Sequence, residues 1–213
     1  MQSSNVRAVL FDFGGVITSS PFEAFRRFEQ DRGLPAGFLQ CINRNRPDSN
    51  AWARFERGEL SAQAFDEMFA SESRAAGHEV RGLDVVALVY GHVRPRMVEA
   101  VKRCRDKFIT ACLTNNFQDS TAARDPSKAR AWQSALALFD EVIESSKVGV
   151  RKPEKAFFEL ACKKLSIRPE QAVFLDDLGA NLKPARAMGM HTIKVSDPDA
   201  ALAELASILQ IDL

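Results

Sequence analysis

The sequence has little of what marks a membrane protein, a secreted protein or a nucleic-acid-binding protein. Its apolar stretches are broken by charges well before the roughly 20 residues that a membrane-spanning helix needs. Lysine and arginine number 29 against 28 aspartates and glutamates, so no positive excess indicates nucleic acid or an acidic membrane surface. Residues 1–5 are polar and too few for a signal peptide. These absences predict a cytoplasmic protein that binds neither nucleic acid nor membranes.

Cysteine and histidine are also scarce and scattered. The cysteines have no metal-binding spacing, and a reduced compartment fits them; they are Cys41, Cys104, Cys112 and Cys162. Cys112 falls in an expected strand and is interpreted as a small core residue. The histidines lie near loops or at the start of a strand, so surface or hydrogen-bonded roles are expected of them rather than catalysis; they are His78, His92 and His191.

One carboxylate stands at the end of an apolar run near the N-terminus. Residues 8–11 are Ala-Val-Leu-Phe, and Asp12 follows them directly. A short apolar run bounded by glycines is typical of a buried strand, and open α/β sheets bind ligands at the carboxyl ends of their strands. Gly14 and Gly15 let the backbone turn sharply and approach a ligand. Asp12 is therefore a candidate nucleophile or metal ligand, although it could also simply cap the turn.

A pair of carboxylates ends a second apolar run. Residues 171–175 precede Asp176 and Asp177, and adjacent carboxylates repel one another unless a cation or hydrogen-bond donors neutralise them. Together with the first acid they would offer the oxygen ligands that Mg²⁺ prefers. One of the pair could instead cap the helix expected to begin near Leu178, but capping does not account for both. Asn181 lies one helical turn after Asp177 and can face the same site.

Two further segments carry groups that suit a phosphate. Thr114 and Asn115 follow an apolar run, where a hydroxyl and a backbone amide can bind a phosphoryl oxygen; an ordinary turn is the alternative. Lys152 precedes Pro153, which favours an extended lysine and can open the following helix. The ammonium could keep Asp12 ionised and neutralise a transferring phosphoryl group, or it could be a solvated surface lysine.

Strand and helix patterns alternate after about residue 96, which predicts an α/β protein with a parallel sheet covered on both faces. The expected strands cover about residues 7–11, 109–114, 141–144, 172–175 and 191–195. The expected helices cover about residues 96–106, 128–137, 153–165, 178–188 and 198–209. A helix-rich stretch from about Pro21 to Tyr90 interrupts the pattern, and its phenylalanines recur at helical spacing, which is typical of a helical core.

Four segments, in this order along the chain, resemble the haloacid dehalogenase (HAD) superfamily. They are residues 10–16 (LFDFGGV), 113–116 (LTNN), 149–153 (GVRKP) and 174–177 (FLDD). Residues 145–154 and 174–186 are most similar to the group that holds the N-terminal phosphatase domain of soluble epoxide hydrolase. Each motif is weak alone, whereas the ordered set is strong, and the likeness runs from about Arg7 to Val195.

The resemblance implies a Rossmann-like parallel sheet with a helical cap inserted after the first strand. It divides the chain into a core of residues 1–18 and 91–213 and a cap of residues 19–90. Such a cap would exclude water and contact the part of the substrate that is not phosphate. The cap residues that could line the pocket, none with an assigned role, are Phe38, Asn43, Arg44, Arg46, Trp52, Arg54 and Phe55.

The resemblance also implies a Mg²⁺-dependent phosphohydrolase that forms an aspartyl-phosphate on a small phosphorylated metabolite. Asp12 would be the nucleophile, with Mg²⁺ held by Asp12, the Gly14 carbonyl and Asp177, and with Asp176 nearby or bound through water. The phosphoryl oxygens would be held by Thr114, the backbone of Asn115 and Lys152, which is electrostatic positioning of phosphoryl transfer. The expected partner is the substrate alone, and the chain is expected to be a monomer or a homodimer.

Gly14 departs from the pattern of the family. Phosphatases of this superfamily usually carry a second aspartate at that position, which by resemblance gives a carbonyl to Mg²⁺ and protonates the leaving group. General acid catalysis is typically worth about 10²–10⁴-fold, so we expect slow turnover, a leaving group that needs no proton, or an acid from the cap. A 2-haloacid dehalogenase and a non-catalytic binding protein stay open as alternatives. The Asp176–Asp177 pair argues against the first, and the retained site residues argue against the second.

Overall fold

A five-stranded parallel sheet forms the centre of the computed structural model, which describes residues 5–117 and 126–213. The strands are β1 (Ala8–Phe11), β2 (Ile109–Thr114), β3 (Glu141–Glu144), β4 (Ala172–Asp176) and β5 (His191–Lys194). Their order in the sheet is β3-β2-β1-β4-β5, so the carboxyl end of β1 lies between those of β2 and β4. The α/β fold expected from the alternating pattern is confirmed.

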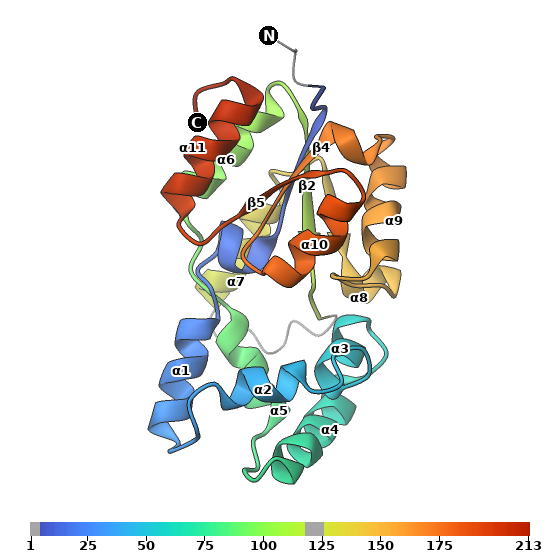
Figure 1. Ribbon diagram of the computed structural model, residues 1–213. Helices are drawn as coiled ribbons and strands as arrows, with labels where there is room; N and C mark the ends of the chain where they lie inside the picture. Colours follow the sequence, from blue (N-terminus) through green and yellow to red (C-terminus); the bar gives the residue numbers. More distant parts are fainter. Residues whose placement is uncertain (1–4, 118–125) are drawn as a thin grey trace.

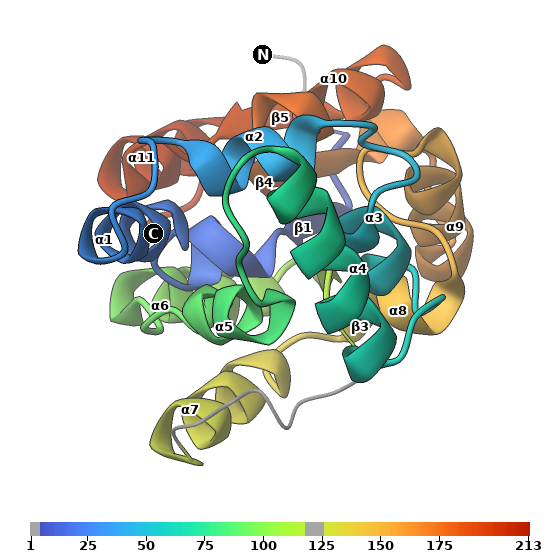
Figure 2. The ribbon, with the colours of Figure 1, turned by 90° about the horizontal axis from the view of Figure 1, so that it is seen from below.

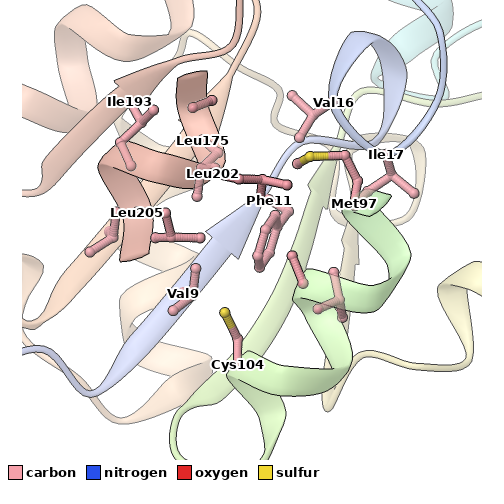
Figure 3. Close-up of a cluster of buried hydrophobic side chains, with 14 of the residues drawn as sticks. Val9, Phe11, Val16, Ile17, Met97, Cys104, Leu175, Ile193, Leu202 and Leu205 are labelled. Carbon is pink, nitrogen blue, oxygen red and sulfur yellow. The ribbon is translucent and has the colours of Figure 1, made fainter. Parts of the chain in front are cut away.

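Both faces of the sheet are covered, which explains why the central strand β1, Ala-Val-Leu-Phe, is apolar and buried throughout rather than alternating. Side chains of successive strand residues point to opposite faces. Val9 and Phe11 of β1 therefore pack against α6 (Pro95–Arg105), α7 (Pro126–Leu136) and α11 (Pro198–Leu209). Figure 3 shows this layer around Phe11. Ala8 and Leu10 pack on the other side against α9 (Lys155–Leu165) and α10 (Gly179–Ala187).

The expected strands and helices begin and end within two residues of their observed bounds. One difference bears on the site. The helix expected from residue 153 begins at Lys155, because Glu154 is extended (φ −60°, ψ 129°) and stands at the N-cap. Pro153 therefore lies in the preceding turn, after a cis Lys152–Pro153 bond. A further short helix, α8 (Ser145–Val148), follows β3 directly.

The stretch between β1 and β2 is a helical insert, a name used here for residues 19–90. It contains α1 (Phe22–Asp31), α2 (Phe38–Arg44), α3 (Ala51–Glu56), α4 (Ala62–Ala75), α5 (Gly82–Val86) and a short turn of 3₁₀ helix (Ala87–Val89). Phe25, Phe65 and Phe69 are buried in its own apolar core, as their helical spacing predicts. Figure 1 shows the insert below the carboxyl ends of the strands, and Figure 2, seen from that side, shows its helices in front of β1 and β4.

The insert leaves and re-enters the core at one place. Thr18 and Val93 form an antiparallel bridge, and the Ser19 backbone N–H donates to the His92 carbonyl at 2.8 Å. Gly91 allows this close approach, because a Cβ there would lie 2.4 Å from the Ser19 carbonyl oxygen. In the part of the chain that the structure describes, no helix has the length and apolar character needed to span a bilayer.

Candidate active site

The register of the sheet brings the predicted acids together. Phe11 of β1 pairs with Leu175 of β4, so the next residues, Asp12 and Asp176, emerge side by side. The Lys152 ammonium lies between them, 2.7 Å from Asp12 Oδ1 and 2.8 Å from Asp176 Oδ2. Its side chain is 1% exposed, so the alternative of a solvated surface lysine is wrong. Asp12, Lys152 and Asp176, which are far apart in the sequence, thus form one buried cluster.

Each carboxylate oxygen of Asp176 accepts two hydrogen bonds. Its Oδ1 accepts from the Leu178 backbone N–H at 2.8 Å and from Asn181 Nδ2 at 3.0 Å, while Oδ2 accepts from Asn181 at 3.1 Å and from Lys152. Helix α10 has no side-chain cap at its N-cap residue, Leu178, so capping does not explain the acid. The contact with Asn181 agrees with the prediction that this residue faces the site. Asp176 is therefore built to hold Lys152 in place.

Asp177 sits over the turn that follows the first strand. It is partly exposed, and its Oδ2 accepts a bond of 3.4 Å from Ser20 Oγ, at the start of the helical insert. Gly15 lies directly beneath it with φ +79°, and a Cβ at Gly15 would be 2.2 Å from Asp177 Oδ2. Gly14 has ordinary angles (φ −71°, ψ 128°), and a Cβ there would meet nothing within 4 Å. A side chain is thus excluded at Gly15, whereas the backbone and the space at Gly14 would accept one.

The cluster holds more negative charge than its single lysine neutralises. Burial raises the pKa of Asp12, and Lys152 only partly opposes the rise. Burial and the neighbouring Asp176 raise the pKa of Asp177 to about 6. Burial alone would lower the pKa of Lys152, but Asp12 and Asp176 outweigh it and raise that pKa, so the ammonium stays charged. Three carboxylates share one ammonium, so keeping all three ionised in this largely buried cluster is costly without a further cation.

The residues present fit a divalent cation. One oxygen from each of Asp12, Asp176 and Asp177 lies within 4.8 Å of the others. All are hard oxygen donors, which favour Mg²⁺ over softer metals. Asp176 is already saturated, whereas Asp12 Oδ2 has no hydrogen bond from the described residues. This difference favours Asp12 and Asp177 as direct ligands.

The carboxyl end of β2 supplies the side where a phosphate would bind. Thr114 is the last residue of this strand, which neighbours β1 in the sheet, and its side chain is buried. Asn115 forms a two-point clamp on Lys152: its Nδ2 donates to the Lys152 carbonyl, and its Oδ1 accepts from the Lys152 backbone N–H, both at 2.9 Å. The Asn115 side chain is thereby occupied. Its backbone N–H donates to no acceptor within residues 5–117 and 126–213, which leaves it available to a ligand.

Sequence reasoning missed the residues that hold these loops in place. Asn116 accepts from Ser146 Oγ at 2.8 Å and donates to Glu144 at 2.6 Å, which ties the end of β2 to α8. Arg94 donates to the Gly15 carbonyl at 2.7 Å and fixes the turn after Asp12. Glu56, from the insert, reaches the Asn115 clamp at 3.1 Å. The Thr-Asn-Asn run was a visible signal for the first of these, whereas the contacts of Glu56 have no local signature.

The insert residues suggested as pocket-lining have varied surroundings. Phe38 and Phe55 are buried in the insert's own core. The Trp52 indole N–H donates to Glu56 Oε1 at 2.9 Å, and Arg54 pairs with Glu59 at 3.3 Å. The remaining three are two exposed arginines, Arg44 and Arg46, and an asparagine with a buried Oδ1 that has no partner within the described residues, Asn43.

Comparison with known proteins agrees with this geometry. The family model described as haloacid dehalogenase-like hydrolase matches residues 6–189. The chain is 36% identical to mouse acyl-CoA dehydrogenase family member 10 over 97% of its length, and 32% identical to pig bifunctional epoxide hydrolase 2 over 98%. It spans only 19% and 40% of those two proteins. A sesquiterpene phosphatase from Aspergillus oryzae is 26% identical and is matched over 95% of this chain and 96% of its own.

Solved structures share the fold at low sequence identity. The HAD hydrolase YfnB from Bacillus subtilis, bound to magnesium, has a TM-score of 0.65 at 20% identity and covers 97% of this chain and 99% of its own. A HAD family enzyme from Bacteroides thetaiotaomicron, in complex with magnesium and inorganic phosphate, has a TM-score of 0.58 at 18% identity over 89% and 93%. With the family model matching most of the sequence, the chain belongs to the haloacid dehalogenase-like hydrolases.

Proposed function

We propose that this protein is a Mg²⁺-dependent phosphohydrolase that acts on a small phosphorylated metabolite through an aspartyl-phosphate. The observation that carries the proposal is the buried Lys152 ammonium, held 2.7 Å from Asp12 and 2.8 Å from Asp176 at the strand ends, with Asp177 beside them. A nucleophile, a cation and an acidic metal cluster in one place are the parts that phosphoryl transfer requires. The phosphatase among the relatives supports the same chemistry.

Asp12 is the nucleophile in this proposal. The Phe13 backbone N–H, at 2.6 Å, and Lys152 both hold Oδ1 and so orient the carboxylate. One carboxylate oxygen attacks phosphorus in line while the other would face the metal; the new P–O bond forms, and the bond to the leaving group breaks. Water then attacks the acyl phosphate, releases inorganic phosphate and restores Asp12. Thr114, the Asn115 backbone N–H and Lys152 bind the phosphoryl oxygens in both steps.

The metal would be held by Asp12, the Gly14 carbonyl and Asp177, with Asp176 acting through water. When bound, Mg²⁺ would neutralise the charge of the phosphoryl group and of the acids around it. Asp176 has a second role toward Lys152, because it fixes the ammonium from the side opposite Asp12. The helical insert would act as a cap that excludes water and contacts the leaving group.

The leaving group is expected to be one that departs without a proton. Gly14 places no acid beside the nucleophile, and the space in front of its Cα is open to 4 Å. Aryl and acyl phosphates have stable leaving anions, whereas alkyl alcohols need protonation, which is worth about 10²–10⁴-fold. We therefore expect a strong dependence of rate on the pKa of the leaving group. Equal rates across leaving groups of different pKa would contradict it.

The experiment that tests the proposal is hydrolysis of p-nitrophenyl phosphate, measured with Mg²⁺, with EDTA and with the isosteric Asp12→Asn variant. We expect turnover that needs Mg²⁺ and that Asp12→Asn abolishes while circular dichroism shows an unchanged fold. Wild-type rates in the variant would overturn the nucleophile assignment. Chloride release from a 2-haloacid without Mg²⁺ would instead support the dehalogenase alternative, and Mg²⁺ or phosphate binding without turnover would support a binding protein.

A further inference from the structure

A buried carboxylate joins the helical insert to the two loops that carry the phosphate-binding groups. Glu56 is the last residue of α3, and its side chain is 8% exposed. Its Oε1 accepts from the Trp52 indole N–H at 2.9 Å, within the insert. Its Oε2 faces the core and accepts from Arg151 Nε at 2.5 Å and from Asn115 Nδ2 at 3.1 Å. Three donors from three segments thus converge on one buried charge.

The two core partners of Glu56 flank the residues proposed for chemistry. Asn115 directly follows Thr114, and Arg151 directly precedes Lys152. The amide group that Glu56 touches is the one that clamps the Lys152 backbone through both its N–H and its carbonyl. A continuous series of short contacts therefore runs from α3 through Asn115 and Lys152 to Asp12.

A buried charge is costly unless it is paired and hydrogen-bonded, so this carboxylate is stable only when the insert rests on both loops. Moving α3 away from the core would separate Glu56 from Arg151 and from the Asn115 side-chain amide. The same junction has further contacts, among them a bond of 3.3 Å from Arg151 Nη1 to the Pro47 carbonyl. Two others do not involve Glu56 or Arg151. Arg57 pairs with Glu154 at 3.2 Å, and the Phe55 and Phe117 rings stack at 4.7 Å. Neither touches Asn115 or Lys152.

We propose, on the basis of the function proposed above, that Glu56 is a positioning residue that couples seating of the helical insert to placement of Lys152. When Glu56 accepts its hydrogen bonds from Asn115 and Arg151, the Asn115 side chain is held in place and the Lys152 ammonium stays against Asp12. Without the Glu56 carboxylate, the insert can still contact the core through the Arg57–Glu154 pair and the Phe55–Phe117 stack. The Asn115 side chain then loses its hydrogen bond to the insert. Displacing a catalytic group by about 1 Å from a remote position can cost about 10²-fold in rate.

The test is Glu56→Gln, with Glu154→Gln as the matched control. Glutamine keeps the size of the side chain but offers a single acceptor oxygen to three donors, and its NH₂ opposes those of Arg151 and Asn115. Glu154→Gln makes the same charge change at the same junction, in a pair whose side chains form no hydrogen bond with Asn115 or Lys152 within the described residues. With p-nitrophenyl phosphate we expect Glu56→Gln to lower kcat by about 10- to 100-fold with KM within about threefold. Glu154→Gln should stay within about twofold of wild type.

Arg151→Gln removes the other side of the same buried pair and should reproduce the kcat loss, so the proposal remains testable should Glu56→Gln fold poorly. Glu56→Asp, which keeps the charge, should recover part of the rate. Wild-type kcat in Glu56→Gln would overturn the proposal, because it would show that Glu56 does not affect the placement of Lys152. An equal loss of kcat in Glu154→Gln would also overturn it, because it would show that any contact between insert and core has the same effect.

A readout independent of activity separates this inference from the proposed function. The chain has two tryptophans, so Trp132→Phe leaves Trp52 as the reporter at the junction. In that background, Glu56→Gln should increase acrylamide quenching of Trp52 at least about twofold, and Glu154→Gln should change it less. A wild-type protein that hydrolyses no phosphate ester would refute the proposed function; unchanged quenching in Glu56→Gln would refute the role of Glu56 in seating α3.

Discussion

At the scale of single residues, the two glycines after Asp12 are under different constraints. Gly15 has a left-handed backbone and lies against Asp177, so a side chain is excluded there by both conformation and space. Gly14 has backbone angles open to any residue and empty space in front of its Cα. The missing general acid is therefore not a steric consequence of the turn, and the site can receive one.

Gly14→Asp should install that acid. We expect hydrolysis of alkyl phosphates to rise by about 10²-fold, toward the lower end of what general acid catalysis supplies, while aryl phosphates change little. Steady-state kinetics on a matched pair of alkyl and aryl phosphates measures the effect. Gly14→Asn has the same size and no acid, so an equal gain in that control would show that side-chain bulk, not proton donation, is responsible.

Gly15→Ala should damage both stability and the site. The left-handed conformation costs a non-glycine residue about 1–2 kcal/mol, and the added methyl would collide with the Asp177 carboxylate. Urea unfolding should show at least this loss, and the metal affinity should fall with it. Gly14→Ala, at the neighbouring open position, should unfold within about 0.5 kcal/mol of wild type. Equal behaviour of the two variants would disprove the assignment of separate roles.

At the scale of elements, the helical insert depends on a buried acid between α4 and α5. Asp66 accepts a hydrogen bond from the Leu83 backbone N–H at 3.0 Å and pairs with Arg81. Burial would raise the pKa of Asp66, but the bonds from Arg81 and Leu83 outweigh it and lower that pKa. A lowered pKa means that the carboxylate stabilises the fold above its unfolded value of about 3.8 and loses this effect as the pH falls through the lower folded value.

Asp66→Ala should therefore cost about 1–3 kcal/mol at pH 7, because the partly buried Leu83 N–H loses its acceptor and Arg81 loses its partner. The difference from wild type should shrink below about pH 3.8. Glu79→Ala removes an exposed partner of Arg74 and should change little, since such pairs are screened by solvent. Thermal melts at both pH values measure both variants. A loss in Asp66→Ala that persists undiminished in acid would contradict the ionic explanation.

The elements themselves were largely predictable from the sequence, because they follow local patterns. β2, β3 and α11 occupy the expected residues, since apolar runs and the Asp197–Pro198 helix start are local signals. The start of α9 was predicted two residues early, because Pro153 serves the turn that directs Lys152 inward. The acids and the lysine were also predictable from motifs. Glu56 and Arg94 were not, because their contacts join segments 59 to 95 residues apart and leave no trace in local spacing.

At the scale of the whole molecule, the buried carboxylate cluster would link the proposed metal binding to stability. Burial, helped by neighbouring carboxylates, raises the pKa of both Asp12 and Asp177, so ionising them in the metal-free fold is unfavourable and a bound cation would offset that cost. A ligand at 100 times its Kd stabilises a fold by about 2.7 kcal/mol. For a chain of this size that corresponds to a rise in Tm of about 5–10 °C.

Adding Mg²⁺ to EDTA-treated protein should therefore raise its Tm by about that amount at pH 7.5. Because the pKa of Asp177 is about 6, protons compete with the metal below that pH, and the rise should diminish as the pH falls through 6. Asp177→Asn should lose most of the shift at every pH. Differential scanning calorimetry measures the Tm of the wild type at pH 5 and 7.5 and of Asp177→Asn. A Mg²⁺-induced Tm rise of equal size at pH 5 and 7.5 in the wild type would exclude Asp177 as a ligand.

The chain leaves the core for the insert and returns from it at one place, and this has an evolutionary meaning. Because Ser19 and His92 are hydrogen-bonded neighbours, the two ends of the insert are one strand spacing apart whatever chain lies between them. Loop-closure entropy grows only slowly with length, so this gap tolerates a short turn as well as five helices. If the insert acts as the proposed cap, its replacement would change the leaving-group preference while the register that aligns Asp12, Lys152 and Asp176 stays the same.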